Sequence, residues 1–315
     1  MKHRTALAVP LLVGAAMAAH VLLPAAGPAK SAASAPLPAS TSSAPSAPSA
    51  LSAAGTPSAP GAPSGQPSTN AAATTPQQAL KLALDGIGAH HGRFALAVED
   101  LTSGRSAAYG PPSETFASAS IVKVDILAAL LLQAQDRGEQ LGAAQRQLAS
   151  DMIRVSDNDA AQKLWTDIGR RQGLDAANAR LGLTPAHAGQ TAPWGLTRTT
   201  TGEQITLLKA VFTQDSPLNA ASRAYARTLM STVTDEQNWG ISAAATPGNP
   251  PALKNGWLPT GTAQSWTVNS IGTVEHDGHT LLVAVLTDGQ PTQRAGITLA
   301  EQAAATAVEA LLRIP

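Results

Sequence analysis

The sequence contains no cysteine. The protein therefore has no disulfide, no cysteine nucleophile, no thiolate ligand for a metal ion and no cysteine for lipid attachment. Acidic residues are absent before Asp85, and Lys2, Arg4 and Lys30 are the only Lys or Arg residues before Lys81. Because three of the 21 basic residues lie in this first part, the rest of the chain has 18 basic against 21 acidic residues. This slightly acidic balance argues against a nucleic-acid-binding surface.

Residues 1–29 combine a short basic start, an apolar run and small residues around Ala25, Ala26 and Ala29. This pattern is typical of a secretory signal peptide. An uncleaved membrane anchor is the alternative, because the apolar run is about as long as a bilayer span of ~20 residues. We therefore expect a secreted or extracytoplasmic protein, associated with the cell wall or held at the membrane by this segment.

Residues 30–76 consist almost entirely of Ala, Ser, Pro, Gly and Thr. The segment has no charge after Lys30 and hardly any large apolar residue. Such a composition cannot bury enough surface to offset the loss of chain entropy on folding. We predict a disordered linker here, followed by one folded domain at residues 77–315.

Hydrophobic periodicity in the folded part predicts an α+β domain. The predicted elements are a helix from Thr75-Pro76 to about His90, strands at 93–99 and 105–109, a helical block at 120–232, three further strands from 251 to 289, and a helix at about 295–313. This order predicts a five-stranded antiparallel sheet that is flanked by the N- and C-terminal helices and interrupted by an all-helical insert.

The stretch Glu275-His276-Asp277-Gly278-His279 contains residue types that bind metal ions. It also lies between two strand patterns, and Asp-Gly at its centre is typical of a two-residue hairpin turn. We therefore predict a turn at this position, and neither a metal ion nor a cofactor in the protein.

Ser120 and Lys123 are three residues apart at the start of an apolar helix, so their side chains are expected on the same side of its first turn. The alternative is that Ser120 caps the helix, although a capping box needs Glu or Gln where Lys123 stands. A lysine here opposes the helix dipole, at a cost of roughly 0.3–1 kcal/mol. The same position favours the neutral amine that a lysine base requires.

Two further motifs follow. Ser156-Asp157-Asn158 lies between two helical patterns, and its alternative interpretation is a loop whose Asp or Asn caps the next helix. Lys254-Asn255-Gly256 lies on a predicted strand after the helical block. Asn-Gly alone would instead predict a tight hairpin turn, with Lys254 at its rim.

In this order and these contexts, the three motifs resemble those of the penicillin-recognising serine enzymes, most closely the class A β-lactamase family. The resemblance covers nearly all of residues 77–315. It implies that Ser120 is the nucleophile that attacks a β-lactam or D-alanyl amide carbonyl and forms an acyl-enzyme. Lys123 would be the base or proton relay, Ser156 would pass a proton to the leaving nitrogen, and Asp157 would brace the loop.

The resemblance also implies a set of substrate contacts. Asn158 would hydrogen-bond the amide side chain of the substrate, and Lys254 would attract its carboxylate. Gly256 would let the strand backbone come close to the ligand. The backbone N–H groups of Ser120 and Trp257 would form the oxyanion hole.

Three departures from the family pattern bear on function. Asn255 stands where the family usually has Thr or Ser, so an amide replaces a hydroxyl at this substrate-binding position. The stretch between Lys123 and Ser156 is shorter than in the family. The loop at about 182–201 contains no acidic residue, whereas the family carries there a glutamate that activates the deacylating water, and Glu203 follows the loop.

These observations leave three functions open. The first is a class A β-lactamase-like serine hydrolase with weak or atypical turnover. The second is a D-alanyl-D-alanine peptidase or another cell-wall amidohydrolase, and the third is a non-catalytic domain that binds the cell wall or β-lactams. The expected partners are a β-lactam or D-alanyl peptide substrate and peptidoglycan, with no nucleic acid, and the protein is expected to be a monomer.

Overall fold

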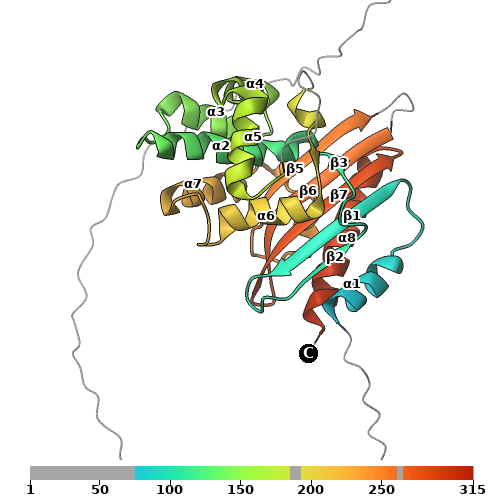
Figure 1. Ribbon diagram of the computed structural model, residues 1–315. Coiled ribbons are helices and arrows are strands. Elements are labelled where there is room, and N and C mark those ends of the chain that lie inside the picture. The colour runs from blue at the N-terminus through green and yellow to red at the C-terminus, as the bar shows by residue number, and fades with distance from the viewer. Residues whose placement is uncertain (1–74, 185–192, 261–264, 315) are drawn as a thin grey trace, which may run out of the picture. The chain divides into compact units, whose positions relative to one another are not determined.

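Five strands form one antiparallel sheet in the computed structural model, which describes residues 75–184, 193–260 and 265–314 (Figure 1). The strands are β1 (Arg93–Asp100), β2 (Ser106–Tyr109), β5 (Ala252–Thr260), β6 (Ser265–His276) and β7 (His279–Gln290). They pair in the order β2-β1-β7-β6-β5, so β5 is an edge strand. This arrangement confirms the predicted sheet. The predicted signal peptide and nearly all of the predicted linker lie outside the described residues.

Helices flank the sheet and build the insert. The flanking helices are α1 (Pro76–Asp85) and α8 (Gln293–Leu312), and those of the insert are α2 (Val122–Asp136), α3 (Ala143–Arg154), α4 (Asn158–Asp167), α5 (Arg170–Leu181), α6 (Thr201–Phe212) and α7 (Ala220–Met230). Single 3-10 turns are η1 (Ala119–Ile121), η2 (Trp194–Leu196), η3 (Asp235–Gln237) and η4 (Gly240–Ala244). The described helices include none that is long and apolar enough to cross a membrane.

The sheet separates two hydrophobic cores. Side chains alternate between its faces along each strand, so Ala95 and Ala97 of β1 join one core while Leu96 and Val98 join the other. Helices α1 and α8 cover the second face, and the helical insert covers the first (Figure 1). Helix α2 lies at the centre of the insert. Its residues are buried on nearly all sides, as expected of a helix that is apolar all round.

Two predicted details can be compared with the structure. Residues 277 and 278 form the turn between β6 and β7, with φ of +48° and +81°, which confirms the predicted hairpin. His279, the last residue of this stretch, contacts Asp100 of β1. Its Nδ1 lies 2.8 Å from a carboxylate oxygen of Asp100. The first helix ends at Asp85 and not near His90, because Gly86 caps it and Gly88 follows.

A two-stranded sheet was not predicted. Strand β3 (Phe116–Ala117) pairs with β4 (Arg198–Thr199), which joins the segment before Ser120 to the segment before α6. Two-residue strands are too short to show the alternation from which strands are predicted. This pairing places η2, which precedes β4, beside η1 at the start of α2.

Candidate active site

Ser120 lies in the 3-10 turn η1, directly before α2. Helix α2 begins at Val122 and has no side-chain cap, so the alternative that Ser120 caps this helix is wrong. The hydroxyl of Ser120 is half-buried and makes no hydrogen bond to the described part of the chain. Ala119 has φ of +50°, a left-handed conformation that L-residues adopt only under constraint from their surroundings. The turn thus presents a free hydroxyl from a strained backbone.

Strand β5 approaches this turn closely at Gly256. A Cβ atom at residue 256 would lie only 2.6 Å from the backbone nitrogen of Ser120 and 2.8 Å from that of Ile121. Only glycine permits this contact without displacement of the backbone. From β6, the buried amide of Asn269 donates hydrogen bonds to the carbonyls of Ala117 (2.8 Å) and Ser118 (3.1 Å). The edge strand and Asn269 together fix the position of η1.

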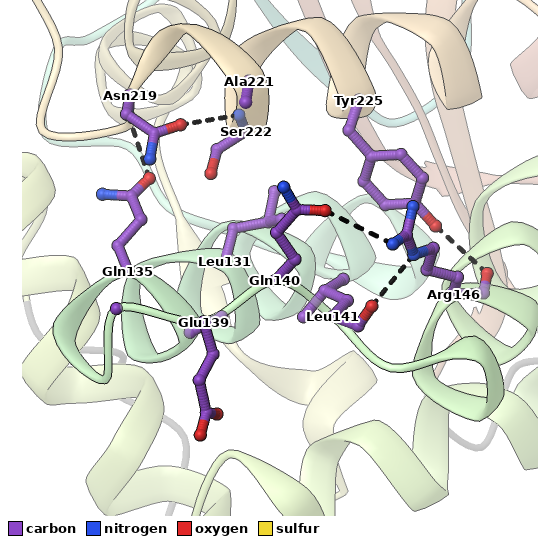
Figure 2. Close-up of a pocket in the computed structure, with 12 residues that line it drawn as sticks. Leu131, Gln135, Glu139, Gln140, Leu141, Arg146, Asn219, Ala221, Ser222 and Tyr225 are labelled. Carbon is purple, nitrogen blue, oxygen red and sulfur yellow. Dashed lines mark hydrogen bonds between the residues drawn. The ribbon is translucent and has the colours of Figure 1, made fainter.

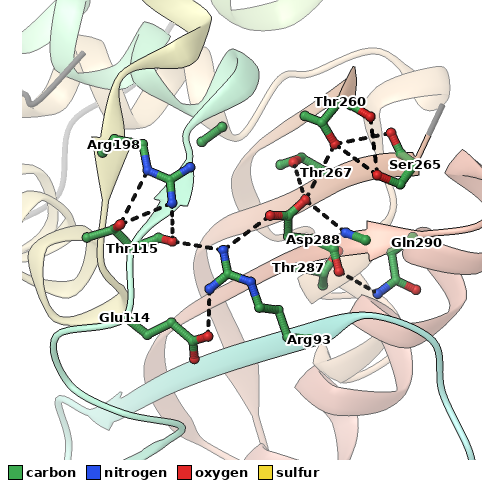
Figure 3. Close-up of polar contacts among 12 residues, drawn as sticks. Arg93, Glu114, Thr115, Arg198, Thr260, Ser265, Thr267, Thr287, Asp288 and Gln290 are labelled. Carbon is green, nitrogen blue, oxygen red and sulfur yellow. Dashed lines mark hydrogen bonds and ion pairs between the residues drawn. The ribbon is translucent and has the colours of Figure 1, made fainter. Parts of the chain in front are cut away.

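Two arginines hold the segment that leads into the turn (Figure 3). Arg93 of β1 and Arg198 of β4 both donate to the backbone carbonyl of Thr115, at 3.1 and 2.5 Å. Arg93 also pairs with Asp288 (3.2 Å) and Glu114 (2.6 Å). The residues before Ser120 are therefore anchored to β1 and to β4.

Lys123, one turn after Ser120, is fully buried and its amine is surrounded by acceptors. Its Nζ donates to the backbone carbonyl of Ser156 (2.6 Å), to Oγ of Ser156 (3.1 Å) and to Oδ1 of Asn158 (2.8 Å). The structure thus brings the first two predicted motifs together, although they are 33 residues apart in sequence. Lys123 makes no hydrogen bond to Ser120.

Ser156 lies between two lysines. Nζ of Lys254 is 2.9 Å from Oγ of Ser156, on which Lys123 also converges, and Lys254 donates a second hydrogen bond to the carbonyl of Asn255 (2.7 Å). Ser156 has φ of +59°, the second strained residue of the site. The third predicted motif therefore meets the second at this hydroxyl, which is in position to exchange protons with either amine.

Burial changes the protonation of both lysines. Burial lowers the pKa of Lys123 to about 7, against a smaller opposing influence from the negative charge of Asp157. Burial, together with the positive charge of Lys123, holds the pKa of Lys254 well below its ordinary value. A neutral Lys123 can accept a proton, and among its three partners only the hydroxyl of Ser156 can donate one. Lys123 is therefore available as a base near neutral pH.

The other residues of the second motif divide into two roles. The carboxylate of Asp157 accepts a hydrogen bond from the backbone N–H of Ala160 (2.6 Å) and caps α4. This agrees with the alternative prediction that an Asp or Asn of this motif caps the next helix. Asn158 is exposed and uses only its Oδ1 for Lys123, so its amide N–H groups remain available. Asp157 is structural, whereas Asn158 can donate to a ligand.

Asn255 is the predicted site residue that the structure presents least to a ligand. It is completely buried, and its amide nitrogen donates to the carbonyls of Gln237 (2.7 Å) and Trp239 (3.0 Å). Its Oδ1 is also buried and has no hydrogen-bond partner among the described residues. The side chain braces the segment between η3 and η4 against β5, and that segment carries Trp239, whose ring lies 5.8 Å from the ring of Trp257.

Trp194 was not predicted as a site residue. Its ring centroid lies 5.0 Å from Nζ of Lys123, within the range of a cation–π contact. Trp194 belongs to the loop in which the family carries the deacylating glutamate, so the sequence located the loop but not the side chain that faces the lysine. Glu203, the first acidic residue after this loop, accepts from the backbone N–H of Thr200 (2.8 Å) in the capping box of α6.

Comparison with known proteins identifies the family of the chain. A model of the beta-lactamase enzyme family matches residues 139–311, more than half of the chain. The chain belongs to this family. The matched segment contains the second and third motifs, whereas Ser120 and Lys123 precede it. Among curated proteins, none matches the sequence.

Solved structures show the same fold. A structure of PBP-A is 19% identical, with a TM-score of 0.64, and the match covers 75% of this chain and 96% of that chain. A beta lactamase from Xanthomonas campestris pv. campestris is 22% identical, with a TM-score of 0.62, and the match covers 76% of this chain and 99% of that chain. A class A beta-lactamase from Bacteroides cellulosilyticus is 15% identical, with a TM-score of 0.63, and the match covers 75% of this chain and 99% of that chain. The protein therefore has a β-lactamase-like α+β fold, as predicted.

Proposed function

We propose that this protein is an exported serine hydrolase that β-lactams acylate on Ser120 and that releases the acyl group slowly. The observation that carries the proposal is the hydroxyl of Ser156 between the buried amines of Lys123 and Lys254, at 3.1 and 2.9 Å. This cluster can move a proton from the nucleophile to the leaving nitrogen. A β-lactam also carries the carboxylate that the cationic form of Lys254 would attract.

Acylation would use residues that are already in place. The Ser120 oxygen forms a bond to the lactam carbonyl carbon, the C–N bond of the ring breaks, and the hydroxyl proton reaches the ring nitrogen by way of Lys123 and Ser156. Backbone N–H groups of Ser120 and Trp257 would stabilise the oxyanion, a contribution worth ~2.7–4 kcal/mol per donor in a comparable enzyme. The close approach of Gly256 to the nitrogen of Ser120 supports this pairing.

Among the described residues, no carboxylate is in position to assist deacylation. Lys123 forms no hydrogen bond to a carboxylate among the described residues, and the ring of Trp194 faces its amine instead. Residues 185–192, which the structure does not describe, contain no Asp or Glu either. Glu203 is engaged in capping α6. We therefore infer that water attacks the acyl-enzyme without carboxylate assistance, and slowly.

A D-alanyl-D-alanine peptidase is the second candidate. The missing carboxylate favours it, because an acceptor amine can resolve the acyl-enzyme without an activated water. A single-residue mutant of PBP-A, which has the same fold, forms an acyl-enzyme complex with penicillin G, so an acyl-enzyme is compatible with this fold under either candidate. The third possibility, a binding domain without turnover, would keep the fold and lose the reactivity of Ser120.

The test uses the full chain with two substrates. Incubation with a chromogenic cephalosporin should give slow hydrolysis that Ser120→Ala abolishes and that the exposed control Ser113→Ala leaves unchanged. Release of D-alanine from a pentapeptide would identify the peptidase instead. If neither substrate reacts, or if Ser120→Ala reacts like the wild type, the proposal is wrong.

A further inference from the structure

A hollow of ≈ 450 Å³ lies in the helical insert, between the C-terminal half of α2, the loop to α3, and α7 (Figure 2). Its size falls within the ~300–1,000 Å³ range of small-molecule sites. It is lined by Leu131, Ala134, Gln135, Gly138, Glu139, Gln140, Leu141, Arg146, Asn219, Ala221, Ser222 and Tyr225. The residues proposed for catalysis are not among them.

The floor of the hollow is apolar. Leu131 and Ala134 of α2 and Leu141 of the following loop line it and are buried. The half-buried ring of Tyr225 lies at one side (Figure 2). Burying a hydrocarbon chain against such a surface is favourable because it removes apolar area from water. Ser222, buried in α7, adds one hydroxyl that makes no hydrogen bond among the described residues.

The charge at the mouth of the hollow is positive. Arg146 donates from Nε to the carbonyl of Leu141 (2.9 Å) and from Nη2 to Gln140 (3.4 Å), and no carboxylate pairs with it in the described part of the chain. The acidic residue of the lining, Glu139, pairs with Arg137 (2.8 Å) and points away from Arg146 (Figure 2). The guanidinium is therefore fixed in place but not neutralised.

We propose that this hollow binds a small amphiphilic carboxylate. The carboxylate pairs with the guanidinium of Arg146, whose planar donors match its two oxygens. The hydrocarbon part lies on Leu131, Ala134 and Leu141. An amphiphilic amine would be repelled by Arg146, and a neutral chain would gain only the apolar contact. The positive charge of Arg146 and the apolar lining residues together favour an amphiphilic carboxylate over the other two kinds of ligand.

The proposed ligand site is separate from the candidate active site. Lys123 is in the first turn of α2 and Ala134 in the last, 11 residues further on, or ~16 Å at 1.5 Å per residue. Binding therefore does not depend on the nucleophile, and Ser120→Ala should bind the carboxylate as the wild type does. A failure of the proposed function would leave this proposal intact.

The experiment is isothermal titration of the full chain with sodium octanoate, with octan-1-ol and octylamine as matched chains without the negative charge. Octanoate should bind to one site, at least tenfold more tightly than either control. Arg146→Gln should weaken octanoate binding about tenfold or more, because a charge-assisted hydrogen bond contributes ~1.5–3 kcal/mol. Arg294→Gln, which alters an exposed arginine of α8, on the other face of the sheet, should bind like the wild type.

A second variant tests the proposal in case Arg146→Gln does not fold. Ala221 is exposed on α7 at the edge of the hollow, so Ala221→Trp should fill the space and abolish binding without changing the far-UV circular dichroism. Three results would overturn the proposal: no octanoate binding by the wild type, equal binding of octanol, or unchanged octanoate binding by a folded Arg146→Gln or Ala221→Trp variant.

Discussion

The indole ring of Trp194 lies 5.0 Å from Nζ of Lys123, and Trp194 belongs to the loop that, by the family resemblance, would carry an activating carboxylate. An aromatic ring can stabilise the charged amine, but it cannot take a proton from water. This contact explains why the two halves of the reaction should differ in rate. Acylation uses Lys123 and Ser156, whereas no carboxylate among the described residues can activate the water for deacylation.

Replacing this ring with a carboxylate should restore the missing base. Trp194→Glu is expected to accelerate release of a penicillin acyl group from Ser120 by at least ~100-fold, the lower end of general-base contributions. Trp194→Phe, which keeps a ring, should release it at the wild-type rate. Both rates can be measured from the decay of the intact acyl-enzyme mass. Equal decay in the Glu and Phe variants would show that deacylation is not limited by a base at this position.

Acylation should depend on pH through Lys123. Its pKa of about 7 means that the neutral amine dominates above this pH, so the acylation rate constant should rise with pH up to about 7 and level off above about 8. Lys123→Arg, which stays charged, should abolish acylation at all these values. The exposed control Lys163→Arg should keep the full profile. A flat profile from about pH 5.5 to 8.5 would contradict the role of Lys123 as base.

Asp125 should make the stability of the domain depend on pH. Burial raises the pKa of this carboxyl to about 7, with a further contribution from the charge of Glu203. The folded chain therefore binds more protons than the unfolded chain between about pH 4 and 7, and its stability falls as pH rises through this window. Asp125→Asn should raise the free energy of unfolding at pH 7.5 by at least ~1.4 kcal/mol, which corresponds to one pKa unit.

Urea denaturation at pH 4.5 and pH 7.5 measures this difference. Most of the gain from Asp125→Asn should be lost at pH 4.5, near the lower end of this window, because the carboxyl is then protonated in the folded chain. Asp167→Asn, at an exposed position of α4, should change stability little at either pH. An equal effect of Asp125→Asn at both values would mean that its charge is not the cause.

Gly256→Ala should impair acylation and stability together. The added Cβ would meet the nitrogen of Ser120 at 2.6 Å, and either β5 or η1 would have to move. Overpacking of this kind costs ~1–3 kcal/mol, and a displaced N–H group would weaken the oxyanion hole. Gly142→Ala is the control, because nothing lies within 4 Å of a Cβ there and its φ is −65°. Wild-type acylation by Gly256→Ala would contradict the proposed contact.

Much of the fold could be predicted because its signals are local. Asp277-Gly278 determines a hairpin by its backbone conformation alone, and the alternation in β1 and β7 identifies strands that separate two cores. The three motifs that resemble the family could also be recognised from their local sequence. The structure brings the amines of Lys123 and Lys254 to the hydroxyl of Ser156.

The residues that could not be predicted act through distant contacts. Asn269 lies in an ordinary strand pattern, and its role in holding residues 117 and 118 depends on how β6 packs against η1. Trp194 reaches Lys123 only because β4 pairs with β3. Asn255 was interpreted from its place in a motif, but its amide is occupied by backbone carbonyls that no sequence pattern reveals.

The most direct test of the account is the intact mass of the full chain during incubation with penicillin G. The account predicts an increase equal to one penicillin molecule, located on Ser120 by peptide mapping, that persists long after free penicillin is removed. Ser120→Ala should show no increase, and Ser113→Ala should behave as the wild type does. No adduct together with no hydrolysis, or an adduct on another residue, would contradict the assignment of Ser120 as the nucleophile.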